Sequence, residues 1–281
     1  MPDPQRPSPA PSTAAHRLGC VSYLNARPLI EGLEAGPDPQ VRFDVPAELL
    51  GDLEAGQVDL ALCPVVDYFR AAEPLVIVPV GGIASEGPTF TVRLFSKVPI
   101  DRVRVVHADT DSHTSVVLLQ VLLHAMHDRR PTLIDYHARE HVAGHRLADA
   151  PEAMLLIGDK VVTDSPRAVA YPHQLDLGEA WHDLTGLPFL FAVWMARQGT
   201  ALGDLPARLA RQREHNARHI HAIAERHGPA HGWPVDLAHD YLGRILRYTV
   251  GERELEAVRR LAAMAAPLGL LPGGRELVVH Q

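Results

Sequence analysis

The chain has 281 residues, 46% of them hydrophobic, and its 34 acidic and 27 basic residues give a formal charge of −7. A chain of this length and apolar content can bury a sizeable core, and we expect it to divide into two lobes. No stretch concentrates lysine and arginine as a phosphate-binding surface does, so the sequence predicts no nucleic-acid partner.

The N-terminal end differs in composition from the rest of the chain. Residues 1–15 are rich in Pro, Ser and Ala and lack the apolar stretch of a signal peptide, so we expect a disordered leader. No later stretch reaches the roughly 18 apolar residues of a membrane span. Cys20 and Cys63 lie in apolar runs without CxxC spacing, as buried thiols of a reducing compartment do. These features predict a cytoplasmic protein with no membrane partner.

The segment Leu18–Leu29 is the most informative part of the sequence. Its apolar run ends in Tyr23 and Asn25, and a helical pattern follows, in which Asn25 suits the N-cap and Pro28 the first turn. In an open α/β sheet, ligands bind beyond the carboxyl end of such a strand. An ordinary strand-to-helix turn is the alternative, and the local pattern alone favours it.

Alternating strands and helices are predicted up to residue 95. The expected strands are 41–45, 58–64, 75–80 and 89–95, and the expected helices are 47–55 and 65–70. The repeated order of helix, glycine, strand and proline indicates βαβ units with a buried parallel strand. Ser85 and Gly87 lie in a glycine-rich loop at 81–88, where the backbone can approach a ligand, although such loops are more often only turns.

A strand, a polar loop and a helix follow at 104–107, 108–113 and 114–127. Ser112 or His113 suits the helix cap, which leaves Thr114 and Ser115 at the positive end of the helix dipole. A carboxylate binds well at such an end. Capping alone is the alternative, but the hydroxyl groups exceed what one cap requires.

The second half of the chain repeats the strand endings of the first. The strand at 153–159 ends in Gly158 and Asp159, where Asp159 either contacts a ligand or caps the next turn. A strand at 189–195, which contains Trp194, returns the chain to the first lobe, and residues 204–268 are helical. We expect a two-lobed α/β fold with a hinged cleft: one lobe at 16–96 plus 191–281, the other at 97–190.

The histidines and glycines do not predict a metal or a cofactor. Of the 17 histidines, His137, His141 and His145 are spaced four apart, as on one helix face, and His215, His219 and His221 form a second group. HExxH is absent, and no cysteine or carboxylate completes either group. The GxGxxG, P-loop and GxSxG patterns are also absent, so neither nucleotide binding nor a serine hydrolase is indicated.

Short motifs follow one another in a fixed order between Leu18 and Trp194. They are Tyr23-Leu-Asn25 with Pro28-Leu29, Gly56-x-Val-Asp-Leu-Ala-Leu-x-Pro64, Ser85-x-Gly-Pro88, Asp111-Ser-x-Thr-Ser115, Ile157-Gly-Asp159 and Trp181-x-x-Leu-Thr-Gly-Leu-Pro-Phe-x-Phe-Ala-x-Trp194. The ordered set resembles the chorismate dehydratases of the futalosine route of menaquinone biosynthesis. Lys160 departs from that family, in which alanine or a similar residue often follows Ile-Gly-Asp.

This resemblance implies the fold of type II periplasmic binding proteins used as a cytoplasmic lyase. The implied reaction is the loss of water from chorismate, a hydro-lyase step that gives 3-[(1-carboxyvinyl)oxy]benzoate. Asn25 and Tyr23 are then the expected catalytic residues, which hold the reacting geometry. The expected substrate contacts are Ser85, Gly87, Ser112, Thr114, Ser115, Gly158, Asp159 and Trp194. No conventional base stands at these positions, so we expect a substrate carboxylate to accept the proton.

Three other functions fit the same pattern. A solute-binding protein for a small carboxylate shares the fold but normally needs export. The 1,4-dihydroxy-6-naphthoate synthase of the same pathway is the nearest enzymatic alternative. A ligand-sensing effector domain is the third, although no DNA-binding helix-turn-helix precedes the fold.

Overall fold

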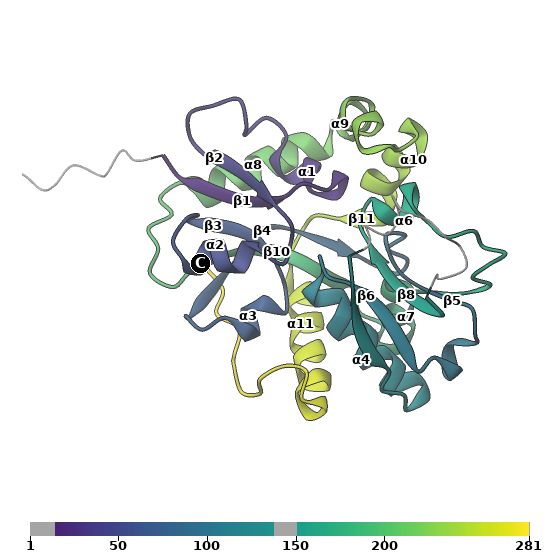
Figure 1. Cartoon of the computed structure of the whole chain (residues 1–281). Helices are drawn as coiled ribbons and strands as arrows, with labels where there is room; N and C mark the ends of the chain where they lie inside the picture. The colour runs from purple at the N-terminus through teal and green to yellow at the C-terminus, as the bar shows by residue number, and fades with distance from the viewer. Residues whose placement is uncertain (1–14, 138–150, 281) are drawn as a thin grey trace, which may run out of the picture.

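Two β-sheets stand side by side with helices packed against both (Figure 1). The computed structural model describes residues 15–137 and 151–280. The predicted leader therefore lies outside the described residues except at its last position, and so do His141 and His145. No helix in the two described ranges combines the length and hydropathy that a bilayer span requires.

The first sheet combines parallel strands from the N-terminal part with antiparallel strands from later in the chain. In spatial order its strands are β11 (Leu246–Arg247), β4 (Leu75–Ser85), β10 (Phe189–Arg197), β3 (Leu60–Pro64), β1 (Arg17–Val21) and β2 (Gln40–Asp44). β1 pairs in parallel with β2 and β3, and β10 runs antiparallel to β3 and β4. All of β3 is buried, which confirms the strand predicted from the apolar run at 58–64.

The second sheet contains the strands of the middle of the chain. In spatial order they are β7 (Thr132–Tyr136), β6 (Val105–Asp109), β8 (Ala153–Ile157), β5 (Val92–Ser96) and β9 (His173–Asp176). β6 and β8 match the strands predicted at 104–107 and 153–159, and the structure pairs them in parallel. β7 and β9 were not predicted, because both are edge strands that mix polar and apolar residues and form no apolar run.

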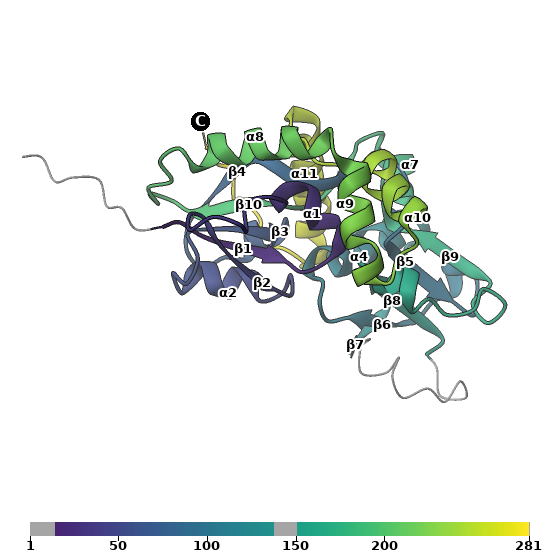
Figure 2. The ribbon, with the colours of Figure 1, turned by 90° about the horizontal axis from the view of Figure 1, so that it is seen from above.

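Helices cover both sheets, and the C-terminal helices connect them. The main helices are α1 (Arg27–Ile30), α2 (Leu49–Glu54), α3 (Asp67–Arg70), α4 (His113–His127), α6 (Lys160–Thr163), α7 (Leu177–Thr185), α8 (Leu205–Ala217), α9 (Ile220–His227), α10 (Val235–Asp240) and α11 (Glu252–Ala265). α8 and α9 pack on α1, as Figure 2 shows from above, whereas α11 contacts both β10 and α4. The C-terminal part of the chain therefore touches elements of both sheets.

The glycine-rich segment after residue 80 is mostly strand rather than the predicted loop. β4 continues through Gly81 and Gly82 to Ser85. A Cβ at Gly82 would lie 2.8 Å from the carbonyl oxygen of Ala192 in β10. Gly82 therefore allows β4 and β10 to pair closely, because any side chain at this position would collide with β10. Gly81 and Gly82, which suggested a loop, belong to a strand.

The chain crosses between the sheets earlier than predicted. The expected division at residue 96 assigns the strand Val92–Ser96 to the first lobe, but β5 pairs with β8 and β9 of the second sheet. The crossing is therefore at residues 86–91. The return crossing, between α7 and β10, is at residues 186–188, near the expected boundary at 191.

The segment after β1 corrects the predicted cap. A 3-10 turn, η1 (Leu24–Ala26), comes between the strand and α1, and the N–H of Ala26 donates to the carbonyl of Tyr23. Asn25 lies inside this turn, and no side chain caps either η1 or α1. The Asn25 amide is therefore not used in capping and can serve the space beyond the strand.

Asp176 fixes the shape of the first crossing. Its carboxylate accepts hydrogen bonds from the backbone N–H groups of Thr89 at 2.9 Å and Phe90 at 2.7 Å. The same carboxylate caps α7 through Gly178 and Glu179. Phe90 has a φ of +67°, a strained value for a residue with a side chain, and the two hydrogen bonds hold it there.

Replacing Asp176 with alanine should destabilise the fold strongly. Asp176→Ala leaves several buried backbone donors without an acceptor, so we expect the free energy of unfolding to fall by about 3 kcal/mol. Urea denaturation measures this change. Asp183→Ala, an exposed position in the same helix, is the control and should stay within about 0.5 kcal/mol of the parent. Equal stability of the two variants would contradict the role given to Asp176.

Candidate active site

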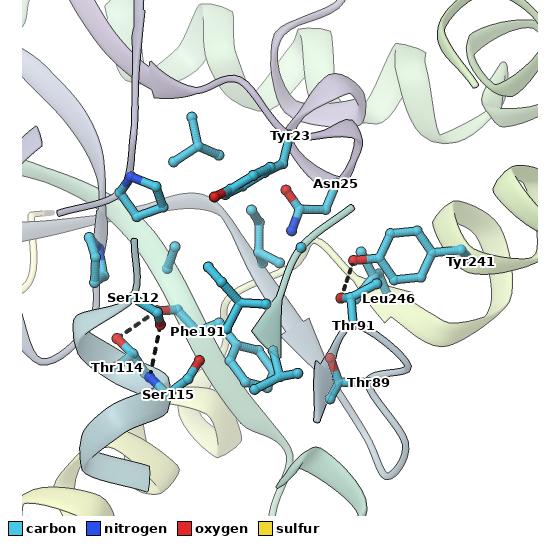
Figure 3. Close-up of a pocket in the computed structure, with 18 residues that line it drawn as sticks. Tyr23, Asn25, Thr89, Thr91, Ser112, Thr114, Ser115, Phe191, Tyr241 and Leu246 are labelled. Atoms are coloured by element: carbon cyan, nitrogen blue, oxygen red, sulfur yellow. Dashed lines mark hydrogen bonds between the residues drawn. The ribbon is translucent and has the colours of Figure 1, made fainter. Parts of the chain in front are cut away.

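A cavity lies between the two sheets, at the carboxyl end of β1 (Figure 3). It encloses about 550 Å³ of space free of atoms, part of it open to solvent. Its polar lining residues are Tyr23, Asn25, Thr89, Thr91, Ser112, Thr114, Ser115 and Tyr241. None of the described residues that line it has a formally charged side chain at neutral pH. The cavity therefore combines an apolar wall with uncharged polar groups.

The α4 end of the cavity is built for an anion. Ser112 is the N-cap, as predicted, and its hydroxyl accepts from the N–H of Ser115 at 3.1 Å. The hydroxyl of Thr114 donates to the carbonyl of Phe191 at 3.1 Å, so its proton is engaged. In Figure 3 the Ser115 hydroxyl points toward the open space instead. The helix dipole and this hydroxyl together suit a carboxylate.

The opposite end of the cavity holds the amide of Asn25. The Oδ1 atom of Asn25 is buried and has no hydrogen-bond partner among the described residues. Thr91 and Tyr241 lie beside it, with their hydroxyl oxygens 2.7 Å apart. Burial raises the pKa of Tyr241 above its usual range, so this phenol stays protonated. An unpaired buried acceptor is costly unless a ligand supplies a donor.

Tyr23 is held by a buried charge network behind the cavity wall. Its hydroxyl donates to Asp111 at 2.8 Å, and the ammonium of Lys160 donates to the same carboxylate oxygen at 2.8 Å. Lys160 also lies 2.5 Å from Asp109 and is only 4% exposed. The departure from the family at Lys160 thus has a structural role, since this cation neutralises buried carboxylate charge.

Gly158 allows the ring of Tyr23 to lie against the backbone. Its φ is +64°, and a Cβ there would approach the ring to 3.1 Å. Both the conformation and the contact require glycine. Gly158 also lines the cavity, as the sequence led us to expect.

Four predicted substrate contacts do not line the cavity: Ser85, Gly87, Asp159 and Trp194. The Ser85 hydroxyl donates to the carbonyl of Gly87 at 3.1 Å, because β4 extends to Ser85 and turns it inward. Trp194 is fully buried in the first sheet, with its indole nitrogen near Gly81. Asp159 is engaged by other protein groups rather than facing the cavity.

The carboxylate of Asp159 joins segments from distant parts of the chain. It accepts from the N–H of Leu24 at 3.2 Å, from His231 at 2.8 Å and from the indole N–H of Trp233 at 2.9 Å. Leu24 adjoins the first sheet, and Asp159 follows β8 of the second. Asp159 was expected either to contact a ligand or to cap the next turn. The structure shows instead that its side chain joins the two lobes.

A second contact between the lobes lies beside Ser112. The Nδ1 atom of His113 is 2.8 Å from a carboxylate oxygen of Asp67, which is fully buried in α3. Burial raises the pKa of Asp67, and His113 opposes that effect. His113 is thus a partner of the first lobe and not the cap that was the alternative to Ser112.

Three polar residues that line the cavity were missed from the sequence. Thr89 and Thr91 fall in the predicted strand 89–95, and their alternation around Phe90 was the available signal for a polar face. Tyr241 lies in the π-turn η5 (Tyr241–Ile245) of a segment with only helical periodicity. Nothing local marks it, because tertiary packing brings it to the cavity.

The histidines that the structure describes form no metal site. Among residues 15–137 and 151–280, no three His, Cys, Asp or Glu side chains meet in an arrangement that could hold a metal ion. His215 lies in the last turn of α8, whereas His219 lies in the break before α9, and the two exposed rings stack with their centroids 4.2 Å apart. The predicted helical spacing of these two histidines, which a helix at 204–268 implies, is therefore wrong.

Removing the buried cation should destabilise the protein in a pH-dependent way. Lys160→Met leaves Asp109 and Asp111 without their partner, and we expect a loss of about 3 kcal/mol at neutral pH. Burial already holds the pKa of Asp109 above its ordinary 3.8, and Lys160 opposes that shift. Without Lys160 the folded state binds this proton more tightly than the unfolded state, so the loss grows as pH rises above 3.8.

Chemical denaturation at several pH values measures this loss. The double variant Lys160→Met/Asp109→Asn removes one of the two uncompensated carboxylates and is the control. It should regain part of the stability and lose the added pH dependence. The same stability for single and double variants at every pH would show that the ion pair has no such role.

Known proteins of menaquinone biosynthesis are similar to this chain in sequence. A family model described as menaquinone biosynthesis matches residues 16–267. The chorismate dehydratase of Thermus thermophilus is 33% identical over 200 residues, which cover 64% of this chain and 69% of that protein. 

Solved structures of low sequence identity share the fold. A protein of Archaeoglobus fulgidus has a TM-score of 0.70 at 16% identity and covers 91% of this chain and 98% of its own. The alkanesulfonate-binding protein of Xanthomonas axonopodis has a TM-score of 0.66 at 17% identity, with 96% and 99% covered. The predicted periplasmic-binding-protein fold is confirmed, and the chain belongs to the menaquinone biosynthesis family.

Proposed function

We propose that this chain is a chorismate dehydratase, a hydro-lyase that converts chorismate to 3-[(1-carboxyvinyl)oxy]benzoate in the cytoplasm. The matched family and the dehydratase of Thermus thermophilus support this proposal. The observation that carries it is the neutral cavity with a helix N-terminus at one end and an unpaired amide oxygen at the other.

Chorismate is a dianion, and the cavity binds it without a charged side chain. The end of α4 offers its dipole and the hydroxyl of Ser115 to one carboxylate. Hydrogen bonds to a charged acceptor are about twice as strong as neutral ones, particularly where water is excluded. The apolar wall, which includes Phe191, Ile157 and Val92, packs against the ring.

The reaction removes the hydrogen at C3 and the hydroxyl at C4. The C3–H and C4–O bonds break, a C3–C4 double bond forms, and the proton and hydroxide leave as water. Aromaticity of the product drives the reaction. The C3 hydrogen is acidified through the C1–C2 double bond, so the ring carboxylate gains negative charge in the transition state. Donors at that carboxylate stabilise this charge.

The proton acceptor is a carboxylate of the substrate itself. None of the described lining residues carries a carboxylate, an imidazole or an amine. Tyr23 donates its hydroxyl to Asp111, which fixes it as a wall of the site. The role of the protein is then to hold the reacting groups in line and exclude water, with Asn25 at the reacting centre.

Chorismate turnover is the direct test. The full chain is incubated with chorismate while the ultraviolet spectrum is followed for an aromatic product, which mass spectrometry then identifies. We expect product in the wild type and a loss of about 100-fold in kcat for Asn25→Ala and Asn25→Asp, because both lose the neutral amide that orients the substrate.

The exposed amide of Gln40 provides the control, and Gln40→Ala should react like the wild type. An absence of product from the wild type, together with tight binding of another metabolite, would favour a solute-binding protein. Normal turnover by both Asn25 variants would remove Asn25 from the mechanism.

The anion end of the cavity makes a separate prediction. Ser115→Ala removes the hydroxyl that faces the open space, so we expect KM for chorismate to rise about tenfold or more, as for a lost hydrogen bond to a charge. Initial rates across chorismate concentrations measure KM. Thr200→Ala, in the turn after β10, is the control. An unchanged KM in Ser115→Ala would place the carboxylate elsewhere.

A further inference from the structure

Two neighbouring side chains hold the start of α4 against the first lobe. The Nδ1 atom of His113 lies 2.8 Å from a carboxylate oxygen of Asp67. The hydroxyl of Thr114 donates to the carbonyl of Phe191 at 3.1 Å (Figure 3). Asp67 begins α3, which follows β3, and Phe191 lies in β10, so both partners belong to the first lobe, whereas α4 follows β6 of the second sheet. The two lobes therefore meet at the first turn of this helix.

The same turn carries the polar groups of the anion end of the cavity. Ser112, Thr114 and Ser115 line the cavity, and Ser112 caps the helix. His113 lies between them in the sequence and contacts Asp67 instead. Because one turn of helix carries both sets of groups, the contact at His113 fixes where the anion end lies relative to the first lobe.

The carboxylate of Asp67 depends on His113. Asp67 is fully buried, and its Oδ2 atom has no hydrogen-bond partner among the described residues. An ionised carboxylate can only accept, so Nδ1 of His113 carries the proton of the bond at Oδ1. Hydrogen bonds to a charged acceptor are stronger than those between neutral groups. The pair therefore favours the arrangement in which α4 is docked on the first lobe.

The contact between the lobes at Asp159 serves the other end of the cavity. Asp159 accepts hydrogen bonds from the N–H of Leu24 and the indole N–H of Trp233. The ring of Trp233 stacks on Tyr241, with the centroids 4.7 Å apart and an interplanar angle of 20°, and Tyr241 lines the cavity. The lobes are thus held together at both ends of the cavity, and the His113 pair acts at the anion end.

We infer that His113 is a positioning residue that docks the substrate-binding turn of α4 onto the first lobe through Asp67. This inference rests on the proposed function. A substrate that contacts both lobes binds the docked arrangement more tightly than any undocked one, so the substrate and the pair favour the same state. Loss of the pair therefore weakens substrate binding. It leaves the reaction of the bound complex nearly unchanged, because the bound substrate itself keeps the lobes together.

His113→Leu tests the inference because it removes the donor and keeps a side chain of similar size. We expect KM for chorismate to rise about tenfold while kcat stays within about twofold of the wild type. Initial rates across chorismate concentrations measure both constants. A merely structural role of His113 would reduce the amount of folded enzyme, which lowers the apparent kcat and leaves KM unchanged.

Two matched variants accompany this test. His113→Asn keeps an N–H donor on the atom bonded to Cγ, where Nδ1 lies, and should retain most of the wild-type affinity. His124→Leu is the control, since this histidine of the same helix is also 34% exposed at its side chain but faces the exposed Asp128. An equal KM in His113→Leu and His124→Leu, with an active wild type, would overturn the inference. A wild type without dehydratase activity would instead remove the proposed function.

A double-mutant cycle connects His113 with Asp67. In the Asp67→Ala background, His113→Leu should raise KM no further, because the pair is already broken. The same fold-rise in both backgrounds would show that His113 acts independently of Asp67 and would contradict the inference. The double variant also removes the buried carboxylate that His113→Leu leaves unpaired. If the single variant does not fold, the double variant is compared with the wild type, and an unchanged KM there has the same meaning.

Discussion

The carboxylate of Asp159 is the contact on which the arrangement of the cavity depends. It follows β8 of the second sheet and accepts hydrogen bonds from Leu24, His231 and Trp233. Those groups belong to the turn after β1 and to the C-terminal segment, so three distant parts of the chain meet at one anion. A carboxylate has lone pairs enough for all three donors, and no neutral side chain of similar size has. The positions of Asn25 and Tyr241 both follow from this contact.

Charge is placed around the cavity and not inside it. Lys160 with Asp109 and Asp111, and His113 with Asp67, lie one layer behind the lining residues. Paired in this way, the charged groups fix Tyr23 and the start of α4 without adding a full charge to the wall. Hydroxyl, amide and helix-end groups then face the ligand, which suits a dianion that must be held but released again after reaction.

The sequence predicted the parts of the fold that depend on local pattern. The buried strand β3, the strands β6 and β8, and a cap at Ser112 or His113 were predicted, because each rests on neighbouring residues. The role of Gly82 could not be read in this way, since strand pairing and a loop both favour glycine. Thr91 and Tyr241 are brought together from positions 150 residues apart, and their contact has no local signature.

A fold shared with binding proteins needs little change to become a catalyst. The alkanesulfonate-binding protein of Xanthomonas axonopodis has the same fold. The added element is a single amide whose acceptor is kept unpaired inside the wall. A buried acceptor of this kind is unfavourable unless a ligand supplies a donor to it. A ligand that brings such a donor is therefore favoured over one that does not, so the amide affects what the cavity selects.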